Sequence, residues 1–218
     1  TVPHKRMVLP SLDSLSPEVR AIGACNTVTV KQGRWRGDNT DVYGFLKGLE
    51  EKRFDPRNKD VVVIGAGGAA RAVIYGLLAH GIRSLVVLNR TLSKAEKLIL
   101  EFSKKYPKTI YAAGALESES SRALLPGKHL IVNTTSVGLK KGDPSPVLSK
   151  DFPKAPGRSL AYDIIYGPPT QFLKIAKQKG YLIQDGFPML LHQGARAFEL
   201  WTGRKAPLAV MKKVLALG

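Results

Sequence analysis

The pattern of apolar and polar residues in the first fifty positions predicts short elements separated by turns. The Ser-Pro-Glu run at 16–18 is typical of a helix start, because serine caps a helix and proline fits its first turn. Gly23 is expected to end this helix. Residues 27–31 alternate polar and apolar positions, which predicts a half-buried strand followed by a turn at 32–34. The apolar spacing after Asp41 predicts a second helix.

From residue 61 onward the pattern becomes an alternation of strands and helices. Residues 61–64 form a continuous apolar run, as expected for a parallel strand that is buried on both faces. The further expected elements are a helix over 69–80, a strand over 84–88, a helix over 91–106, strands over 109–112, 129–133 and 160–165, and helices over 169–179, 187–202 and 207–217. This order predicts an α/β fold with a doubly wound, Rossmann-like parallel sheet.

Composition and charge restrict the classes of partner. The 218 residues include 34 Lys and Arg against 17 Asp and Glu, a formal net charge of +17. This excess is spread along the chain and favours anionic ligands, but no stacking motif indicates a specific nucleic-acid partner. The apolar runs are far shorter than the ~20 residues of a membrane span. One cysteine and four histidines without metal-ligand spacing predict neither a disulfide framework nor a metal site.

A glycine-rich loop follows the apolar run at once. Residues 65–70 read Gly-Ala-Gly-Gly-Ala-Ala and fit the pattern G-x-G-x-x-A. In such a loop Gly65 allows the tight turn, Gly67 lets a pyrophosphate approach the backbone, and Ala70 keeps the helix close to the sheet. The helix N-terminus then presents unpaired N–H groups to the phosphates. The loop therefore predicts a dinucleotide site, and its alternative interpretation is a glycine-rich turn without a ligand.

The end of the next predicted strand indicates which dinucleotide is bound. An NAD site usually has an acidic residue about 20 residues after the glycine loop, for the ribose hydroxyl. Here the strand ends in Asn89, Arg90 and Thr91, with Lys94 one turn later. Arg90 and Lys94 would pair with a 2′-phosphate through charge-assisted hydrogen bonds, so NADP is favoured over NAD. The alternative is that both are solvated surface charges.

Eight stretches taken together resemble the shikimate dehydrogenase family, and the likeness covers essentially the whole chain. They are TVPHK at 1–5, IGACNTV at 22–28, DNTDVYG at 38–44, GAGGAAR at 65–71, NRT at 89–91, NTTSVG at 133–138, YDIIY at 162–166 and GFPMLLHQ at 186–193. The resemblance implies an NADPH-dependent oxidoreductase that reversibly reduces 3-dehydroshikimate to shikimate, a step of chorismate and aromatic amino acid biosynthesis.

The same resemblance implies roles for individual residues. Lys5 and Asp41 would form the catalytic pair. The implied substrate contacts are Thr1, Lys5, Asn26, Asp41, Tyr166 and Gln193. The implied cofactor contacts are Gly65, Ala66, Gly67, Gly68, Ala69, Asn89, Arg90, Thr91, Lys94, Thr135, Ser136, Ile164, Gly186 and Met189. Reduction of the carbonyl group requires a proton donor at its oxygen, and a lysine oriented by a carboxylate can supply the proton.

The resemblance also implies a division of the chain. Residues 1–40 and 187–218 would belong to a substrate domain, and residues 41–186 to the NADP-binding domain. The substrate domain would be incomplete, because the family's leading part, with a Ser-x-Ser motif that holds the substrate carboxylate, is expected before Thr1. Pro188 departs from the small residue expected near the nicotinamide. A cytoplasmic enzyme, a monomer or homodimer without membrane contact, is the further expectation.

Each of these residues has a plainer interpretation when it is taken alone. Lys5 would be a surface lysine, Asp41 a helix cap and Asn26 a turn residue. Gln193 would be a helix-surface amide, Tyr166 and Met189 packing residues, and Thr1 a frayed end. His4 and His192 are predicted to be non-catalytic, and Cys25 to be a small core residue. The alternative functions are a quinate/shikimate dehydrogenase of the same family and a non-catalytic relative that senses a pathway metabolite.

Overall fold

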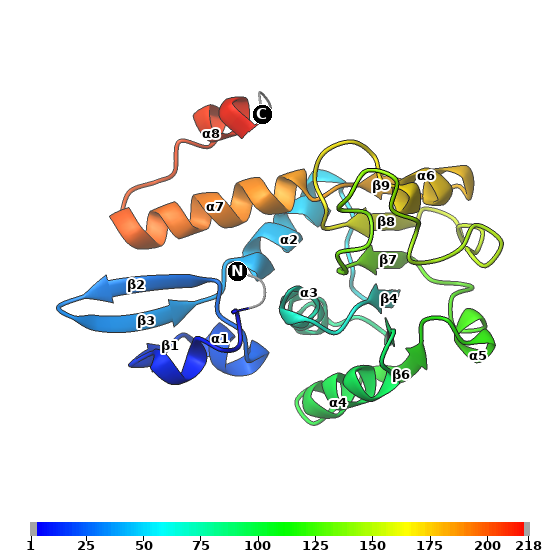
Figure 1. The fold of residues 1–218 in the computed structure, drawn as a ribbon, viewed down its shortest axis with the longest axis horizontal. Coiled ribbons are helices and arrows are strands. Elements are labelled where there is room, and N and C mark those ends of the chain that lie inside the picture. Colours follow the sequence, from blue (N-terminus) through cyan, green and yellow to red (C-terminus); the bar gives the residue numbers. More distant parts are fainter. Residues whose placement is uncertain (1–3, 216–218) are drawn as a thin grey trace.

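The computed structural model describes residues 4–215, which form two sheets joined by helices (Figure 1). The smaller sheet has three strands in the order β1-β3-β2; β3 runs antiparallel to β2 and parallel to β1. Its elements are β1 (Ser14–Leu15), β2 (Thr27–Lys31) and β3 (Arg34–Asp38), with the 3₁₀ helix η1 (Leu9–Ser11) and α1 (Pro17–Ile22). Ser16 caps α1 and Gly23 ends it in the left-handed conformation, as predicted.

The larger sheet has six parallel strands in the order β6-β5-β4-β7-β8-β9. Its strands are β4 (Asp60–Ile64), β5 (Ser84–Asn89), β6 (Ile110–Ala115), β7 (Leu130–Asn133), β8 (Leu160–Asp163) and β9 (Leu182–Gln184). The helices that follow them are α3 (Gly68–Ala79), α4 (Leu92–Ser103), α5 (Glu119–Arg122) and α6 (Gln171–Gln178). The predicted α/β fold is confirmed, and the strand order reverses between β4 and β7, where doubly wound sheets bind their ligands.

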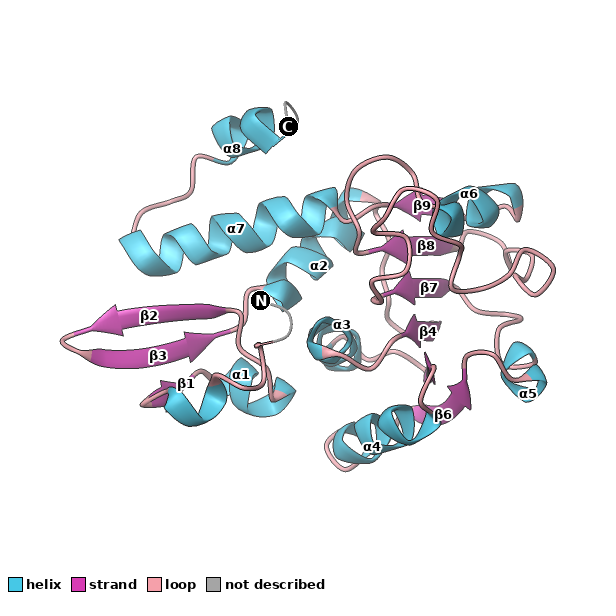
Figure 2. Ribbon diagram, viewed as in Figure 1, coloured by secondary structure: helices cyan, strands magenta, loops and turns pink. Residues whose placement is uncertain are grey.

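Helices lie on both sides of the large sheet (Figure 2). Side chains of β4 alternate between two hydrophobic cores, one on each face of this sheet. Val61 and Val63 pack with α3 and α4, whereas Val62 and Ile64 pack with α6. All four side chains are fully buried. A strand buried on both faces reads as a continuous apolar run, which explains why the sequence pattern located it correctly.

Two long helices lie side by side between the sheets, α2 (Asp41–Glu51) and α7 (Phe187–Thr202), and α8 (Leu208–Leu215) follows α7 (Figure 1). Two glycines on α2 allow close approaches, Gly44 to α7 and Gly48 to β8. A Cβ added at Gly44 would lie 2.5 Å from the Met189 carbonyl oxygen, and one added at Gly48 would overlap the buried Tyr162 hydroxyl. The position of α2 against the large sheet therefore depends on the absence of these side chains. Pro188 fits the first turn of α7, where its missing N–H costs nothing.

Gly48→Ala is expected to lower the free energy of unfolding by about 1–3 kcal/mol, because the added methyl group has no room beside Tyr162. Gly194→Ala is the matched control. It is also a helical glycine, but a Cβ there would meet only the Met211 Cε, at 3.8 Å. This control should be neutral or stabilise by about 0.5–1 kcal/mol, since alanine restricts the unfolded chain more than glycine does. Urea unfolding of both variants measures the difference, and equal midpoints would contradict the packing argument.

Several elements differ from the sequence expectation. β3 was not predicted: only its first residue, Arg34, was assigned to a turn, and Arg34, Trp35 and Arg36 are all exposed and show no alternation. β1, α5 and β9 were not predicted either; each has two to four residues, too few to carry a period. The helix expected over 91–106 is α4, which begins only at Leu92; Thr91 precedes it, and its side chain forms no capping hydrogen bond. Thr40, not Asp41, is the residue before the first turn of α2, so the alternative interpretation of Asp41 as only a helix cap is wrong.

Candidate active site

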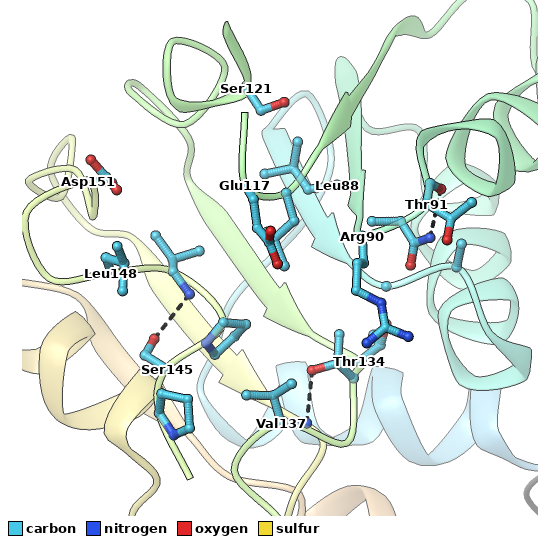
Figure 3. Close-up of a pocket in the computed structure, with 18 of the residues that line it drawn as sticks. Leu88, Arg90, Thr91, Glu117, Ser121, Thr134, Val137, Ser145, Leu148 and Asp151 are labelled. Atoms are coloured by element: carbon cyan, nitrogen blue, oxygen red, sulfur yellow. Dashed lines mark hydrogen bonds between the residues drawn. The ribbon is translucent and has the colours of Figure 1, made fainter. Parts of the chain in front are cut away.

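Two clefts bring most of the predicted site residues together. The larger, of about 720 Å³, lies at the carboxyl ends of the β4, β5 and β7 strands (Figure 3). The smaller, of about 230 Å³, lies between the two sheets. It is lined by Lys5, Asn26, Asp41, Ala69, Ile164, Tyr166, Gly186, Met189, Leu190 and Gln193. All but Leu190 belong to the site predicted from the sequence, although they come from distant parts of the chain.

Lys5 and Asp41 form an ion pair in the smaller cleft. The Lys5 Nζ lies 2.5 Å from the Asp41 Oδ2, and the two side chains are only 13% and 7% exposed. Asp41 is the first residue of α2, so its carboxylate projects from a helix N-terminus. Burial of this kind is unusual for a lysine, and it contradicts the interpretation of Lys5 as a surface residue. The pair places one protonatable amine and one orienting carboxylate at the wall of a cavity.

Asn26 holds the Asp41 carboxylate from the other side. Its Nδ2 donates to the Asp41 Oδ1 at 2.8 Å, and its Oδ1 accepts from the Thr40 N–H at 2.9 Å. The Thr40 hydroxyl in turn donates to the Gln193 Oε1 at 3.4 Å. Both oxygens of Asp41 thus have a donor, which fixes the orientation of the carboxylate toward Lys5. Asn26 and Gln193 are therefore parts of one polar network rather than isolated surface amides.

Tyr166 and Met189 line the same cleft. Tyr166 follows β8 and is 57% exposed, so the packing interpretation of this residue is wrong. Met189 lies in the first turn of α7 and is buried, which agrees both with core packing and with a place at the cleft. Thr1 lies outside the described residues. His4 is exposed, and the His192 Nε2 lies 2.9 Å from the Glu51 Oε1, outside both clefts.

The glycine loop at the end of β4 has the space that a phosphate group needs. Gly65 adopts φ +111°, and a Cβ there would lie 2.5 Å from the Thr134 Oγ1. A Cβ at Gly67 would meet nothing within 4 Å, so the loop is open on the cleft side. No side chain caps α3, whose first N–H groups are therefore free to bind an anion. Gly68, by contrast, lies against the Lys5 side chain: a Cβ added at Gly68 would lie 3.3 Å from the Lys5 Cβ.

Asn89, Arg90, Thr91 and Lys94 line the larger cleft next to the glycine loop. Arg90 and Lys94 are exposed, and neither forms an ion pair with another side chain in the described part of the chain. Asn89 donates from its Nδ2 to the Thr91 carbonyl at 2.8 Å, which shapes the turn after β5. The cations are thus available at the cleft edge for an anionic ligand.

Thr135 and Ser136 also line the larger cleft, on the loop after β7. The Asn133 Oδ1 accepts from the Thr135 N–H and hydroxyl, and its Nδ2 donates to the Asp163 Oδ1 at 3.1 Å. Asp163 ends β8, and burial raises the pKa of its carboxyl above the usual range. This buried network joins the ends of two neighbouring strands. Sequence reasoning assigned no role to Asp163, although a carboxylate ending an apolar strand is a visible signal.

The far wall of the larger cleft was missed by sequence reasoning altogether. In Figure 3, Arg90 and Thr91 lie on one side and Leu148 and Asp151 on the other, with Glu117 between them. The residues of this wall are Leu116, Glu117, Ser121, Arg122, Leu125, Pro144, Ser145, Pro146, Val147, Leu148 and Asp151. They come from α5 and the residues on either side of it, and from the segment between β7 and β8, which has no helical or strand periodicity. An ion pair of 3.2 Å between Arg122 and Asp151 joins these two segments.

Comparisons with known proteins agree with this geometry. A family model described as shikimate / quinate 5-dehydrogenase matches residues 48–118, and one described as the shikimate 5'-dehydrogenase C-terminal domain matches residues 186–216. The shikimate dehydrogenase (NADP(+)) of Moorella thermoacetica is 42% identical over 218 residues, which cover 99% of this chain and 72% of the relative. None of the helices within residues 4–215 is long and apolar enough to cross a membrane.

Two solved structures are similar over the same length. Shikimate 5-dehydrogenase from Thermus thermophilus, in complex with NADP(H) and shikimate, is 40% identical with a TM-score of 0.83, covering 98% of this chain and 75% of that one. Quinate dehydrogenase from Corynebacterium glutamicum, in complex with NAD, is 30% identical with a TM-score of 0.88, covering 100% and 76%. From this identity and coverage, together with the paired clefts, the chain belongs to the shikimate dehydrogenase family of oxidoreductases.

Proposed function

We propose that the protein catalyses the reversible, NADPH-dependent reduction of 3-dehydroshikimate to shikimate, within the biosynthesis of chorismate and the aromatic amino acids. The observation that carries this proposal is the buried Lys5–Asp41 pair in a small cleft that adjoins the glycine-loop cleft. The relatives bearing the name shikimate dehydrogenase (NADP(+)) supply the substrate and cofactor of the proposal.

The larger cleft fits a dinucleotide phosphate. Open space at Gly67 and the uncapped N-terminus of α3 suit a pyrophosphate, and the unpaired cations Arg90 and Lys94 suit a 2′-phosphate. Asn89, Thr91, Thr135 and Ser136 would line the adenosine half. Gly186, Ile164, Met189 and Ala69 line the smaller cleft, where the nicotinamide would face the substrate. When bound, NADPH supplies the hydride of the reaction.

Lys5 would supply the proton of the same reaction. In the reducing direction its ammonium group donates a proton to the carbonyl oxygen of the substrate as the carbonyl carbon receives the hydride. In the oxidising direction the neutral amine takes the proton from the substrate hydroxyl. Asp41, held by Asn26, orients the amine through the ion pair. Asn26, Tyr166 and Gln193 would bind the hydroxyl groups of the substrate, as Thr1 would.

The proposal also divides the chain into two domains. Residues 1–40 and 187–218 would form the substrate domain, and residues 41–186 the cofactor domain. The two separate sheets and the helix pair α2–α7 between them support this division. A cytoplasmic location and a monomer or homodimer complete the proposal, and gel filtration measures the oligomeric state.

The test is reduction of the nicotinamide cofactor, followed by absorbance, with shikimate or quinate as substrate and NADP or NAD as cofactor. Turnover is expected with shikimate and NADP. Preferred turnover of quinate would contradict the shikimate assignment in favour of a quinate/shikimate dehydrogenase. Binding of NADPH and shikimate without any turnover would instead support a non-catalytic, metabolite-sensing protein.

A further inference from the structure

Arg71 is a buried cation that the proposed reaction does not use. It lies in the first turn of α3, directly after the glycine-rich residues 65–70, and its side chain is only 9% exposed. The side chain contributes to neither cleft. Its Nε donates to the carbonyl oxygen of Ile22, and its Nη2 pairs with the carboxylate of Glu101 on α4. The guanidinium also lies 5.7 Å from the ring centroid of Phe102. A buried arginine that is held by two hydrogen bonds and an aromatic ring fixes the geometry of what it contacts.

Arg71 also contacts the C-terminal end of α1, which packs outside the large sheet and its helices. The last carbonyl groups of a helix lack partners within the helix and carry partial negative charge, so a cation there is favourable. Lys105, just after α4, donates from its Nζ to the Ala21 carbonyl at 3.3 Å. Arg71 and Lys105 thus both bind the carbonyl groups at this helix end. A Cβ at Gly23 would lie 3.0 Å from the Arg71 Nη2, so the fit is close.

The segment that follows α1 carries part of the candidate active site. The Cys25 N–H donates to the Lys5 carbonyl oxygen at 2.7 Å, and this bond holds the backbone of the catalytic lysine. Asn26, the next residue, holds the Asp41 carboxylate through its side chain. A displacement of residues 22–26 would therefore move both the Lys5 backbone and the Asn26 amide.

We propose that Arg71 is a positioning residue, which fixes the end of α1 against α3 so that Lys5 and Asn26 meet Asp41 in the productive geometry. Arg71 touches neither substrate nor cofactor in this proposal and acts through the segment 22–26. The same helix that presents its N-terminus to the cofactor thereby sets the position of the proton donor. The expected effect of Arg71 on turnover rests on the proposed function, whereas its role in holding the segment 22–26 does not.

The kinetic test is Arg71→Gln, which keeps much of the length of the side chain but removes its charge and its ability to reach Ile22 and Glu101 together. We expect kcat to fall about 10- to 100-fold, because a small misplacement of a catalytic group has an effect of that size. The dissociation constant for NADPH should stay within about twofold, since Arg71 is outside the cofactor cleft. Arg71→Lys should recover part of the lost kcat, because a lysine still offers a cation to the helix end.

Two control variants separate positioning from a general loss of stability. Arg83→Gln removes an arginine–carboxylate pair with Asp60 that lies at the opposite end of the large sheet, and it should leave kcat unchanged. Phe172→Leu weakens the core on the other face of the large sheet. If Phe172→Leu lowers the unfolding free energy as much as Arg71→Gln and lowers kcat equally, the positioning role is overturned.

An independent readout comes from Cys25, the one cysteine of the sequence, which is 2% exposed and lies in the segment that Arg71 holds. Its reaction with a thiol reagent under native conditions should become about tenfold faster in Arg71→Gln, because local opening exposes it. Arg83→Gln should leave the rate unchanged. An unchanged rate in Arg71→Gln would overturn the proposal.

The thiol assay also keeps the two proposals distinguishable. If the unaltered protein does not turn over shikimate, the proposed function fails, and the Cys25 rate alone decides whether Arg71 holds the segment. If Arg71→Gln does not fold, Glu101→Gln replaces it. That variant weakens the guanidinium's anchor on α4 while leaving Arg71 in place, and the same acceleration of Cys25 is expected.

Discussion

Replacing Lys5 by alanine is expected to lower kcat by about 10³-fold or more, with only a small change in NADPH affinity. The Lys5 amine is the one group of the smaller cleft that is placed to donate a proton and is also oriented by a carboxylate. General acid–base catalysis by a positioned side chain contributes about 10²–10⁴-fold, and the loss of the buried cation also leaves Asp41 without its partner. Steady-state kinetics with shikimate and NADP, together with a titration of NADPH, measure the two quantities separately.

Lys5→Met is the matched variant, because the Lys5 side chain also packs against Gly68 of the glycine loop. Methionine keeps most of the apolar stem and removes the amine. If the proton donor is what matters, both variants lose turnover, and only Lys5→Ala is expected to disturb cofactor binding, slightly, through lost packing. Near-normal kcat in Lys5→Met would show that the amine has no catalytic role.

Arg90→Ala is expected to weaken NADPH binding about tenfold or more and to leave NADH binding nearly unchanged. The two cofactors differ by the 2′-phosphate, and a hydrogen bond to a charged group contributes about 1.5–3 kcal/mol. Arg90 lies at the edge of the larger cleft without another charged partner among residues 4–215, so the phosphate would be its principal contact. Fluorescence titration of each cofactor gives the two dissociation constants.

Lys97→Ala is the control for this comparison. Lys97 is an exposed cation on the same helix, α4, that Arg90 precedes, but it does not line the cleft. It should change the affinity for NADPH by less than about twofold, because exposed charges at a distance are screened. Equal losses of NADPH and NADH affinity in Arg90→Ala would mean that Arg90 supports the shape of the cleft rather than the phosphate.

Local patterns in the sequence were enough to locate the elements that build the cofactor cleft. β4 and α3 carry strong short-range signals, a continuous apolar run and then a helical period, with the glycine loop between them. The cations after β5 could be recognised for the same reason, because a strand end is local information. The pairing of Lys5 with Asp41 came instead from the resemblance to a family, since nothing in the spacing of residues 36 positions apart indicates contact.

The chain by itself therefore determined the strands of a parallel sheet and the residues that follow them, because each of these depends on periodicity within a few residues. The strand order, and with it the switch point between β4 and β7, came from the structure. Only the tertiary structure decided what meets those residues. The far wall with Arg122 and Asp151, the buried link from Asn133 to Asp163, and the contact of Arg71 with the end of α1 all join segments 29 or more positions apart. Such contacts arise from packing of whole elements, which leaves no periodic signal in the amino-acid sequence.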